Sequence, residues 1–339
     1  MKKFLYLFMT IFVVISLSGC GKENKKTILN RLNKKVNNVS GYKLDAQMEL
    51  INNDDSYKYD VTVSYKKDNN YRVSLRNKTN NHEQIILKND DGVYVLTPAL
   101  NKSFKFQSKW PYNNSQSYLI QSVINDLKND TKLSMTKVKS GYMFKSTVNY
   151  KNNRKLTYQK VLVDKNMNIK NVVVYDDSDN AQIKVTFTSI DMRAKFKNNY
   201  FEIDENMNAT EESKKENSDE VESQVNTLDE ALYPMYLPED TYLETEKVVE
   251  IDDGSRIILT FSGESPFMLV EEVSTKNDEM EIIPASGDLD IISGVIAIIG
   301  DTSVSWSNEN IDYYLVSSEL STEELVNVAK SIASMPISK

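Results

Sequence analysis

Residue types that build many common functional sites are almost absent from this 339-residue chain. Cys20 is the only cysteine, so no disulfide can form within a monomer and stability must come from hydrophobic cores. His82 is the only histidine, which excludes metal sites and catalytic motifs built on two histidines. No serine-hydrolase elbow, phosphate-binding glycine loop or dinucleotide fingerprint occurs. The sequence therefore predicts a protein that is not an enzyme, with no cofactor and no metal.

Long apolar runs are scarce as well. The longest, Phe4 to Leu17, spans 14 residues and follows two lysines. A membrane-spanning helix needs about 20 residues, so this run is typical of an export signal over residues 1–19. It ends in Leu17-Ser18-Gly19-Cys20, which resembles the lipobox of bacterial lipoproteins. The resemblance implies cleavage before Cys20, acylation of that cysteine, and anchoring at the outer face of the cytoplasmic membrane. An ordinary signal peptide with an accidental cysteine is the alternative.

Charge is divided unevenly along the chain, although the formal net charge is only −8. Residues 21–200 hold 32 Lys and Arg against 17 Asp and Glu, a net of +15. Residues 201–339 hold 7 against 32, a net of −25. The basic half would be attracted to anionic lipid headgroups or wall polymer, and equally the two halves could attract each other. Nucleic acid is not an expected partner, because an exported lipoprotein does not meet it.

The pattern of apolar residues predicts a first domain over residues 27–203, behind a short tether at 20–26. A helix at 27–39 precedes a series of strands, of which 84–87 and 93–96 flank the hairpin turn Asp91-Gly92. A second helix at 118–127 is followed by five strands between residues 132 and 189. Helices combined with an antiparallel meander indicate an α+β fold, with a curved sheet wrapped over the helices.

A polar segment at 204–227 is predicted to be an acidic linker, because it has almost no large apolar residues. Beyond it, residues 228–339 predict a small α+β domain. Its strands are expected at 243–250, 255–261, 267–273, 280–283, 295–299, 304–306 and 313–316. A final helix follows Ser321, which with Glu324 forms a capping box ahead of a buried apolar face.

Residues 91–107, with Trp110-Pro111 just beyond, resemble the YdcC-like and GerS-like lipoproteins of spore-forming bacteria. These look like relatives of the LolA and LolB carriers and the sensor RseB, so the resemblance implies an open antiparallel half-barrel over about residues 27–200. It also implies an accessory role in handling cortex peptidoglycan, with an exported cortex amidase as partner. The ending from Trp306 to Ile332 is similar to a small extracytoplasmic domain found behind such half-barrels.

Aromatic and basic residues interleave in the segment that carries this resemblance. Phe104 and Phe106 are expected to point into the core. Trp110, Tyr112 and Tyr118 are candidates for the rim of a groove that binds an acyl chain or a partner segment, and Lys102 and Lys105 could meet an anionic ligand. An ordinary solvated strand face is the preferred explanation for the two lysines.

The acidic clusters and the histidine are interpreted as ordinary turn and loop residues. Asp176-Asp177-Ser178-Asp179-Asn180 could supply oxygen ligands to Ca²⁺ but is typical of a hairpin turn, and the same holds for Asp54-Asp55 and Asp288-Leu289-Asp290. His82 lies in a polar stretch and is expected to be a solvated loop residue.

Three functions remain open from the sequence. The leading hypothesis is a membrane-anchored, non-enzymatic lipoprotein that binds an envelope partner protein in sporulation or germination. The second is a lipid or lipoprotein carrier that holds an acyl chain in the half-barrel. The third is an envelope-stress sensor, which lacks a predicted segment to carry a signal across the membrane.

Overall fold

A computed structural model of the chain describes residues 23–52, 55–106, 108–207, 228, 230–251, 254–274, 279–292, 294–308 and 311–333. The predicted signal peptide, the lipobox Leu17-Ser18-Gly19 and the lipidation site Cys20 lie outside these residues. Most of the predicted linker, from residue 208, also lies outside them. None of the helices in the described part is long and apolar enough to cross a membrane.

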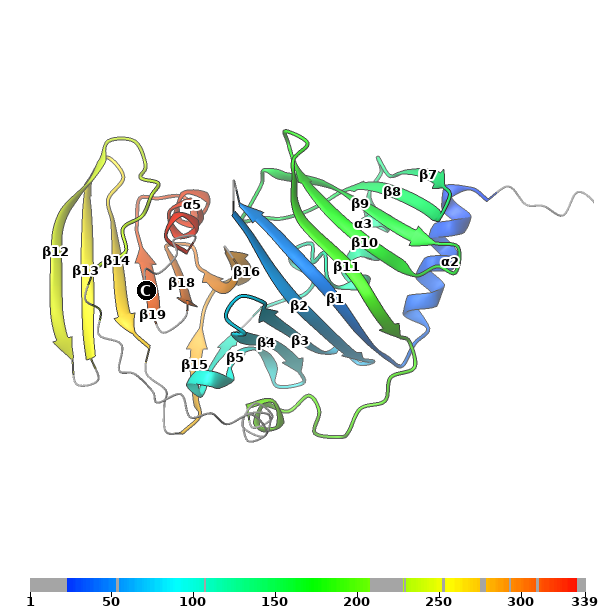
Figure 1. Ribbon diagram of the computed structural model, residues 1–339, viewed down its shortest axis with the longest axis horizontal. Coiled ribbons are helices and arrows are strands. Elements are labelled where there is room, and N and C mark those ends of the chain that lie inside the picture. The colour runs from blue at the N-terminus through cyan, green and yellow to red at the C-terminus, as the bar shows by residue number, and fades with distance from the viewer. Residues whose placement is uncertain are drawn as a thin grey trace, which may run out of the picture.

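A twelve-stranded sheet, here called sheet A, dominates the molecule (Figure 1). Its strand order is β15-β6-β5-β4-β3-β2-β1-β11-β10-β9-β8-β7, and only the β15–β6 pair is parallel. The strands from the N-terminal half are β1 (Gly41–Asn52), β2 (Asp55–Lys66), β3 (Asn70–Asn77), β4 (Glu83–Asn89), β5 (Gly92–Thr97), β6 (Lys102–Phe106), β7 (Ser134–Val138), β8 (Gly141–Thr147), β9 (Leu156–Asp164), β10 (Ile169–Asp176) and β11 (Ala181–Asp191). The predicted antiparallel meander is therefore present.

Two helices pack on the inner face of this sheet, near its β7 end. They are α2 (Lys25–Asn37) and α3 (Ile120–Asn129), and a short 3₁₀ helix, η1 (Pro98–Leu100), links β5 to β6. Ile28, Leu32 and Val36 of α2 are buried in one core with the inward residues of the sheet, because they recur on one helix face. Phe106 is buried in this core and Phe104 packs against it, as predicted. The described fold is largely β with few helices, so the predicted α+β class holds only in part.

A seven-stranded antiparallel sheet, sheet B, forms the C-terminal module. Its order is β12-β13-β14-β19-β18-β17-β16. The strands are β12 (Thr241–Ile251), β13 (Gly254–Gly263), β14 (Phe267–Val273), β16 (Asp288–Ile292), β17 (Val295–Ile299), β18 (Ser303–Asn308) and β19 (Ile311–Val316). Helix α5 (Thr322–Ala333) packs on β16 to β19 through Leu325, Val328, Ala329 and Ile332. The predicted capping box is confirmed, since Ser321 Oγ accepts the Glu324 N–H at 3.3 Å and Glu324 Oε2 accepts the Ser321 N–H at 3.0 Å.

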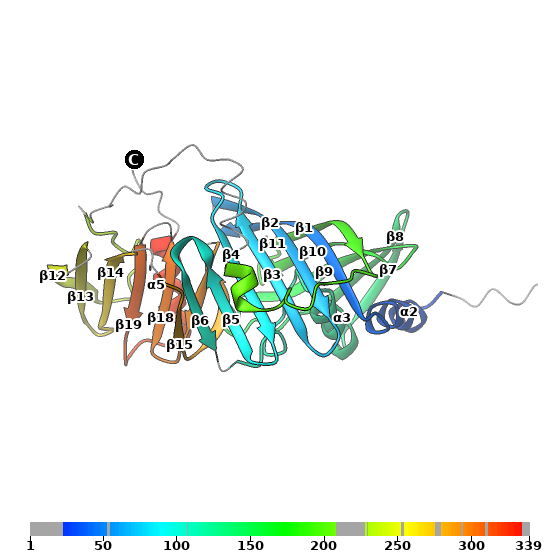
Figure 2. The same cartoon turned by 90° about the horizontal axis from the view of Figure 1, so that it is seen from below.

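Two boundaries differ from the prediction. Asp288-Leu289-Asp290 is the start of strand β16 and not a turn, because Leu289 and Ile292 are buried and the turn falls later, at Gly294. Residues 203–207 are helical, and Met207 is buried with Phe201 against the outer side of β4 and β5 (Figure 2). A linker beginning at residue 204 is therefore wrong for its first four residues.

The C-terminal module is not a separate body joined only by a linker. Strand β15 (Glu281–Ala285), which belongs to this module in sequence, pairs in parallel with β6 and forms one edge of sheet A. Leu289 of β16 and Ile296 of β17 are buried in the core of sheet A. The two halves thus share a hydrophobic core along a seam.

Candidate functional site

The seam is fixed by polar bonds as well as by strand pairing. Lys102 Nζ, at the start of β6, lies 2.6 Å from Asp312 Oδ2 on β19 and donates to Ser274 Oγ at 3.1 Å. Both charged side chains are nearly buried, with exposed fractions of 13% and 10%. A charge in such a place needs a partner, because its desolvation is otherwise not compensated. Lys102, predicted as a ligand for an anion, is instead paired within the protein.

Two further hydrogen bonds cross the same seam. The backbone N–H of Ile296 donates to Gln84 Oε1 at 2.8 Å, and Asn113 Nδ2 donates to Asp288 Oδ1 at 2.7 Å. They satisfy polar groups that burial in the seam would otherwise leave unpaired. Together with the Lys102–Asp312 pair they set the position of β16 and β17 against sheet A.

A cavity of about 110 Å³ remains where the two halves meet. Its walls come from β1, β2, the loop before α3, β16, β17 and α5. The apolar part of the lining includes Met48, Leu50, Ile86, Leu289, Ile291 and Ile296, and the polar part includes Gln116, Ser117, Asn153, Gln182, Asp290 and Lys330. Two other hollows in the described part of the chain hold only about 20 and 10 Å³, so this cavity is the candidate site.

The predicted groove residues do not form one site. Trp110 and Tyr118 line the cavity, but Trp110 is fully buried and packs edge-on against Tyr71, with ring centroids 5.7 Å apart. A rim position is therefore wrong for Trp110, which is a core residue. Tyr112 is 67% exposed and its hydroxyl donates to Asn69 Oδ1 at 2.7 Å.

Lys105 is distant from that cavity. Its Nζ lies 5.4 Å from the centre of the Tyr94 ring, which is buried in the outer cluster with Phe201. Neither Lys105 nor Tyr112 lines the cavity. The predicted residues are close in sequence, but the fold places them apart.

Asp290 and Lys330 are cavity residues that the sequence did not indicate. Burial raises the pKa of the Asp290 carboxyl, while the backbone N–H of Ile291 donates to its Oδ1 at 2.8 Å and opposes that shift. Burial also lowers the pKa of Lys330, and the nearby negative charge of Asp290 opposes this. Each charge thus favours the ionised form of the other. The sequence did not show that Asp290 lies in a buried strand, because its segment has a composition typical of a turn.

The chemistry available in the cavity is limited. Asp290 is the only carboxylate among its lining residues, whereas glycoside cleavage uses two. No group of three His, Cys, Asp or Glu side chains able to hold a metal ion occurs within the described ranges. The cavity can therefore hold a small group or close around a packed segment, and it has no arrangement for acid–base catalysis by a carboxylate pair.

The acidic segment at 176–180 and His82 were both predicted to have ordinary structural positions. The segment 176–180 is the β10–β11 turn, in which Asp176 Oδ1 accepts the N–H groups of Ser178 and Asn180. The predicted hairpin turn is thereby confirmed. His82 was predicted to be solvated, but its side chain is half-buried. This burial lowers the pKa of His82.

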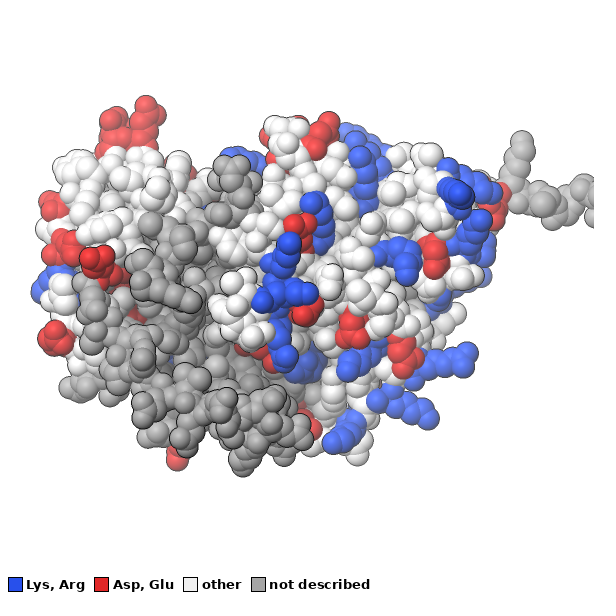
Figure 3. Space-filling view, viewed as in Figure 1, with Lys and Arg blue, Asp and Glu red and all other residues white. Residues whose placement is uncertain are grey.

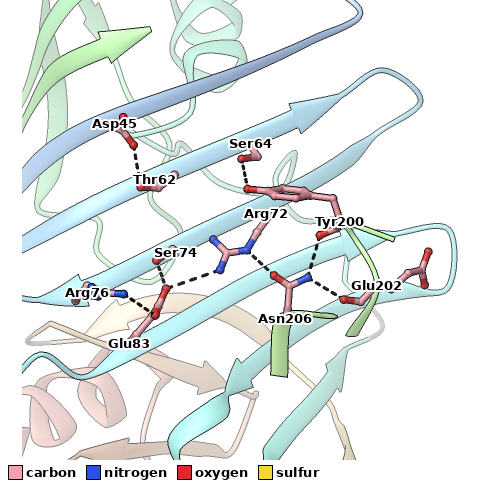
Figure 4. Close-up of polar contacts among 10 residues, drawn as sticks. All are labelled: Asp45, Thr62, Ser64, Arg72, Ser74, Arg76, Glu83, Tyr200, Glu202 and Asn206. Carbon is pink, nitrogen blue, oxygen red and sulfur yellow. Dashed lines mark hydrogen bonds and ion pairs between the residues drawn. The ribbon is translucent and has the colours of Figure 1, made fainter. Parts of the chain in front are cut away.

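A polar network on the outer face holds the segment that follows sheet A (Figure 4). Arg72 Nε donates to Asn206 Oδ1 at 2.5 Å, and Asn206 Nδ2 donates to the carbonyls of Tyr200 and Glu202. Glu83 accepts from Arg76 at 3.1 Å. The network ties the segment around Tyr200 to Asn206 to the outer side of β3 and β4.

Comparison with known proteins identifies the family. The family model for sporulation protein YdcC-like proteins matches residues 1–201, more than half of the chain. The sporulation protein YdcC of Bacillus subtilis (strain 168) is 34% identical over 334 residues, which cover 98% of this chain and 97% of the relative. The chain belongs to the sporulation protein YdcC-like family. The resemblance seen in residues 91–107 is confirmed.

Solved structures match this YdcC-like chain only distantly. The MucA/MucB complex of Pseudomonas aeruginosa gives a TM-score of 0.31 at 12% identity, covering 90% of this chain and 96% of that one. The CwlD amidase of Clostridioides difficile in complex with the GerS lipoprotein also gives 0.31, at 15% identity, covering 52% and 98%. Scores this low do not support an inference for the YdcC-like chain.

Proposed function

We propose that this YdcC-like protein is a lipid-anchored, non-enzymatic accessory protein of the cell envelope, acting in sporulation or germination by binding an envelope partner protein. The observation that carries this proposal is the 34% identity to a sporulation protein over nearly the whole chain. An exported cortex amidase is the partner that the sequence resemblance favours. The site acts through shape and contact, because its lining lacks a catalytic pair.

The anchor is supported by the lipobox and by the helix that follows it. Helix α2 starts five residues after Cys20 and carries Lys25, Lys26, Arg31, Lys34 and Lys35 with no acidic residue. Basic side chains gather at this end of the molecule, which Figure 3 shows on the right. Basic residues beside an anchor are attracted to anionic headgroups by about 1 kcal/mol each. The acyl chains and this helix would hold the same end of the protein at the membrane.

An acyl-chain carrier is the second candidate, favoured by the apolar part of the cavity lining. The volume argues against it, because pockets for drug-sized ligands hold roughly 300–1,000 Å³, whereas this cavity holds about 110 Å³. Leu289, Ile291 and Ile296 of the C-terminal module occupy the space beside sheet A that an acyl chain would need. A bound lipid in native mass spectra of the mature protein would favour the carrier over the partner-binding role.

The proposal is tested in sporulating cells with a tagged chain and a Cys20→Ala variant. We expect the wild-type chain in the membrane fraction, the variant outside it, and one envelope protein enriched with the wild type after crosslinking. A strain that lacks the gene should form or germinate spores less efficiently. A wild-type chain without acyl chains on Cys20 in mass spectra would refute the anchor, and unchanged spore yield and germination without a specific partner would refute the function.

A further inference from the structure

Among the residues that the structure describes, strand β12 is a long unpaired edge of sheet B. Its 11 residues pair with β13 on one side, and β12 is the last strand in the order of the described sheet. Figure 1 places it at the end of the molecule opposite to α2. A free edge presents a row of backbone N–H and C=O groups that another chain can pair with, and natural edge strands are usually short, covered or strongly charged.

Both faces of β12 are exposed, which is unusual for a strand of this length. Residues 242–248 are all exposed, including Tyr242 at 60% and Val248 at 55%. Val248 pairs with the buried Ile257 of β13 and so lies on the same, inner face of the sheet. Tyr242 pairs with Ser262 and lies on the outer face. Apolar side chains therefore stand in solvent on both sides of one edge.

The described elements that cover the inner face of sheet B end just before β12. Helix α5 contacts β16 to β19, and the segment before β12 packs on β14, where the N–H of Leu232 donates to Glu271. That segment contacts β12 through a hydrogen bond from the Tyr233 hydroxyl to Glu246 Oε2 at 2.5 Å, and at the start of the strand Thr241 Oγ1 donates to the Glu239 carbonyl at 3.3 Å. The inner side of β12 thus borders a folded layer that a further strand could extend.

Charge selects the kind of segment that could pair here. The strand carries Glu244, Glu246 and Glu250 against Lys247. In a two-fold antiparallel pair of identical strands, residues of one face oppose residues of the same face. A second copy would bring Glu246 and Glu250 near their own counterparts, and the net charge of −25 over residues 201–339 adds further repulsion. A segment with lysine or arginine at alternate positions has the opposite charge and fits.

We propose that β12 is a docking edge for an extended, positively charged segment of the envelope partner, which adds to sheet B as an eighth strand. The proposal rests on the proposed partner-binding function and names the surface and the partner's chemistry. Backbone hydrogen bonds to the free edge hold the segment. Its cations lie on the inner face opposite Glu246 and Glu250, and the aliphatic stem of the cation between them covers Val248.

The test uses a blocked synthetic peptide of about ten residues in which lysine alternates with threonine or valine, mixed with the full chain without its signal. Hydrogen exchange is expected to slow at residues 243–251. Binding should weaken at least about tenfold when salt is raised from low to high concentration, and at least about tenfold in the E246K/E250K variant. That variant should gain affinity for the matching peptide in which glutamate replaces lysine.

The control variant E264K/E319K makes the same charge change at exposed positions outside β12 and should bind the lysine peptide nearly as well as wild type. Circular dichroism verifies that both variants fold. Protection at β7 or β15 in place of β12, equal loss in both variants, or no protection would overturn the proposal. If the partner from sporulating cells binds wild type and E246K/E250K equally, the docking edge fails while the proposed function stands.

Discussion

Glu271, a buried carboxylate in the C-terminal module, should make the stability of that module depend on pH. The side chain is fully buried on β14, and its two oxygens accept the same backbone N–H, that of Leu232, at 3.1 and 3.0 Å. None of the ion pairs among the described residues includes it. Burial raises the pKa of Glu271 from 4.5 to about 7, the Leu232 N–H opposes this shift, and the negative charge of Glu246 adds to it.

The sign of the effect follows from the direction of this shift. The folded state keeps the proton between pH 4.5 and about 7, where the unfolded state has lost it. The stabilisation is thus complete below pH 4.5 and is lost as the pH rises through about 7. Each unit of pKa corresponds to about 1.4 kcal/mol, so Glu271 lowers the free energy of unfolding by about 3 kcal/mol at pH 8 relative to pH 4.

The substitution Glu271→Gln removes the titration and keeps an oxygen that can accept the Leu232 N–H. We expect the variant to be more stable than wild type by about 2–3 kcal/mol at pH 8 and to differ by less than about 1 kcal/mol at pH 5. Urea unfolding followed by near-ultraviolet circular dichroism at several pH values measures both. Glu319→Gln, at an exposed site, serves as the control. If wild type and Glu271→Gln lose stability in parallel as the pH rises, Glu271 does not carry this proton.

Three further sets of substitutions test the seam, the cavity wall and the last helix. Lys102→Met or Asp312→Asn should each cost about 3 kcal/mol by urea unfolding, and the double variant should cost clearly less than their sum; additive costs would show that the pair is not coupled. Trp110→Ala should lower stability by about 3–5 kcal/mol, while Tyr112→Ala should cost less than about 1 kcal/mol, and similar thermal shifts for the two would contradict the burial difference. Ser321→Ala should lower the free energy of unfolding by about 1 kcal/mol and speed hydrogen exchange at the start of α5. Unchanged exchange there would show that the capping box does not stabilise this end of the helix.

Features set by nearby residues were predictable from the sequence. The β4–β5 hairpin was predicted from Asp91-Gly92 and is present, with its turn one residue earlier: Asn89 pairs with Gly92, so Asp90 and Asp91 form the turn, and Gly92, with φ of 148°, begins β5. The capping box of α5 follows from Ser321 and Glu324 alone. In each case the interaction that decides the structure spans only a few residues, so the local pattern contains the necessary information.

Features that depend on distant residues were not predictable. Strand β15 was expected within residues 280–283, but its parallel pairing with β6 joins residues about 180 apart in sequence, from Glu281 to Lys102. Asp290 has the composition of a turn, yet burial of Leu289 and the nearby Lys330 allow it to lie in a strand beside the cavity. The candidate site is built almost wholly from such contacts, which explains why only Trp110 and Tyr118 of its lining were anticipated.

Opposite net charge does not by itself hold the two halves together. Among the described ion pairs only Lys102–Asp312 joins a residue of the basic half to one of the acidic half. Strand pairing, the shared core around Leu289 and Ile296, and hydrogen bonds such as those of Gln84 and Asn113 also join the two halves. Most of the charge therefore stays on the surface, with basic side chains gathered toward α2 and acidic ones toward β12 (Figure 3). Because surface charges remain available to other molecules, this separation favours an anionic membrane at one end and a basic partner at the other.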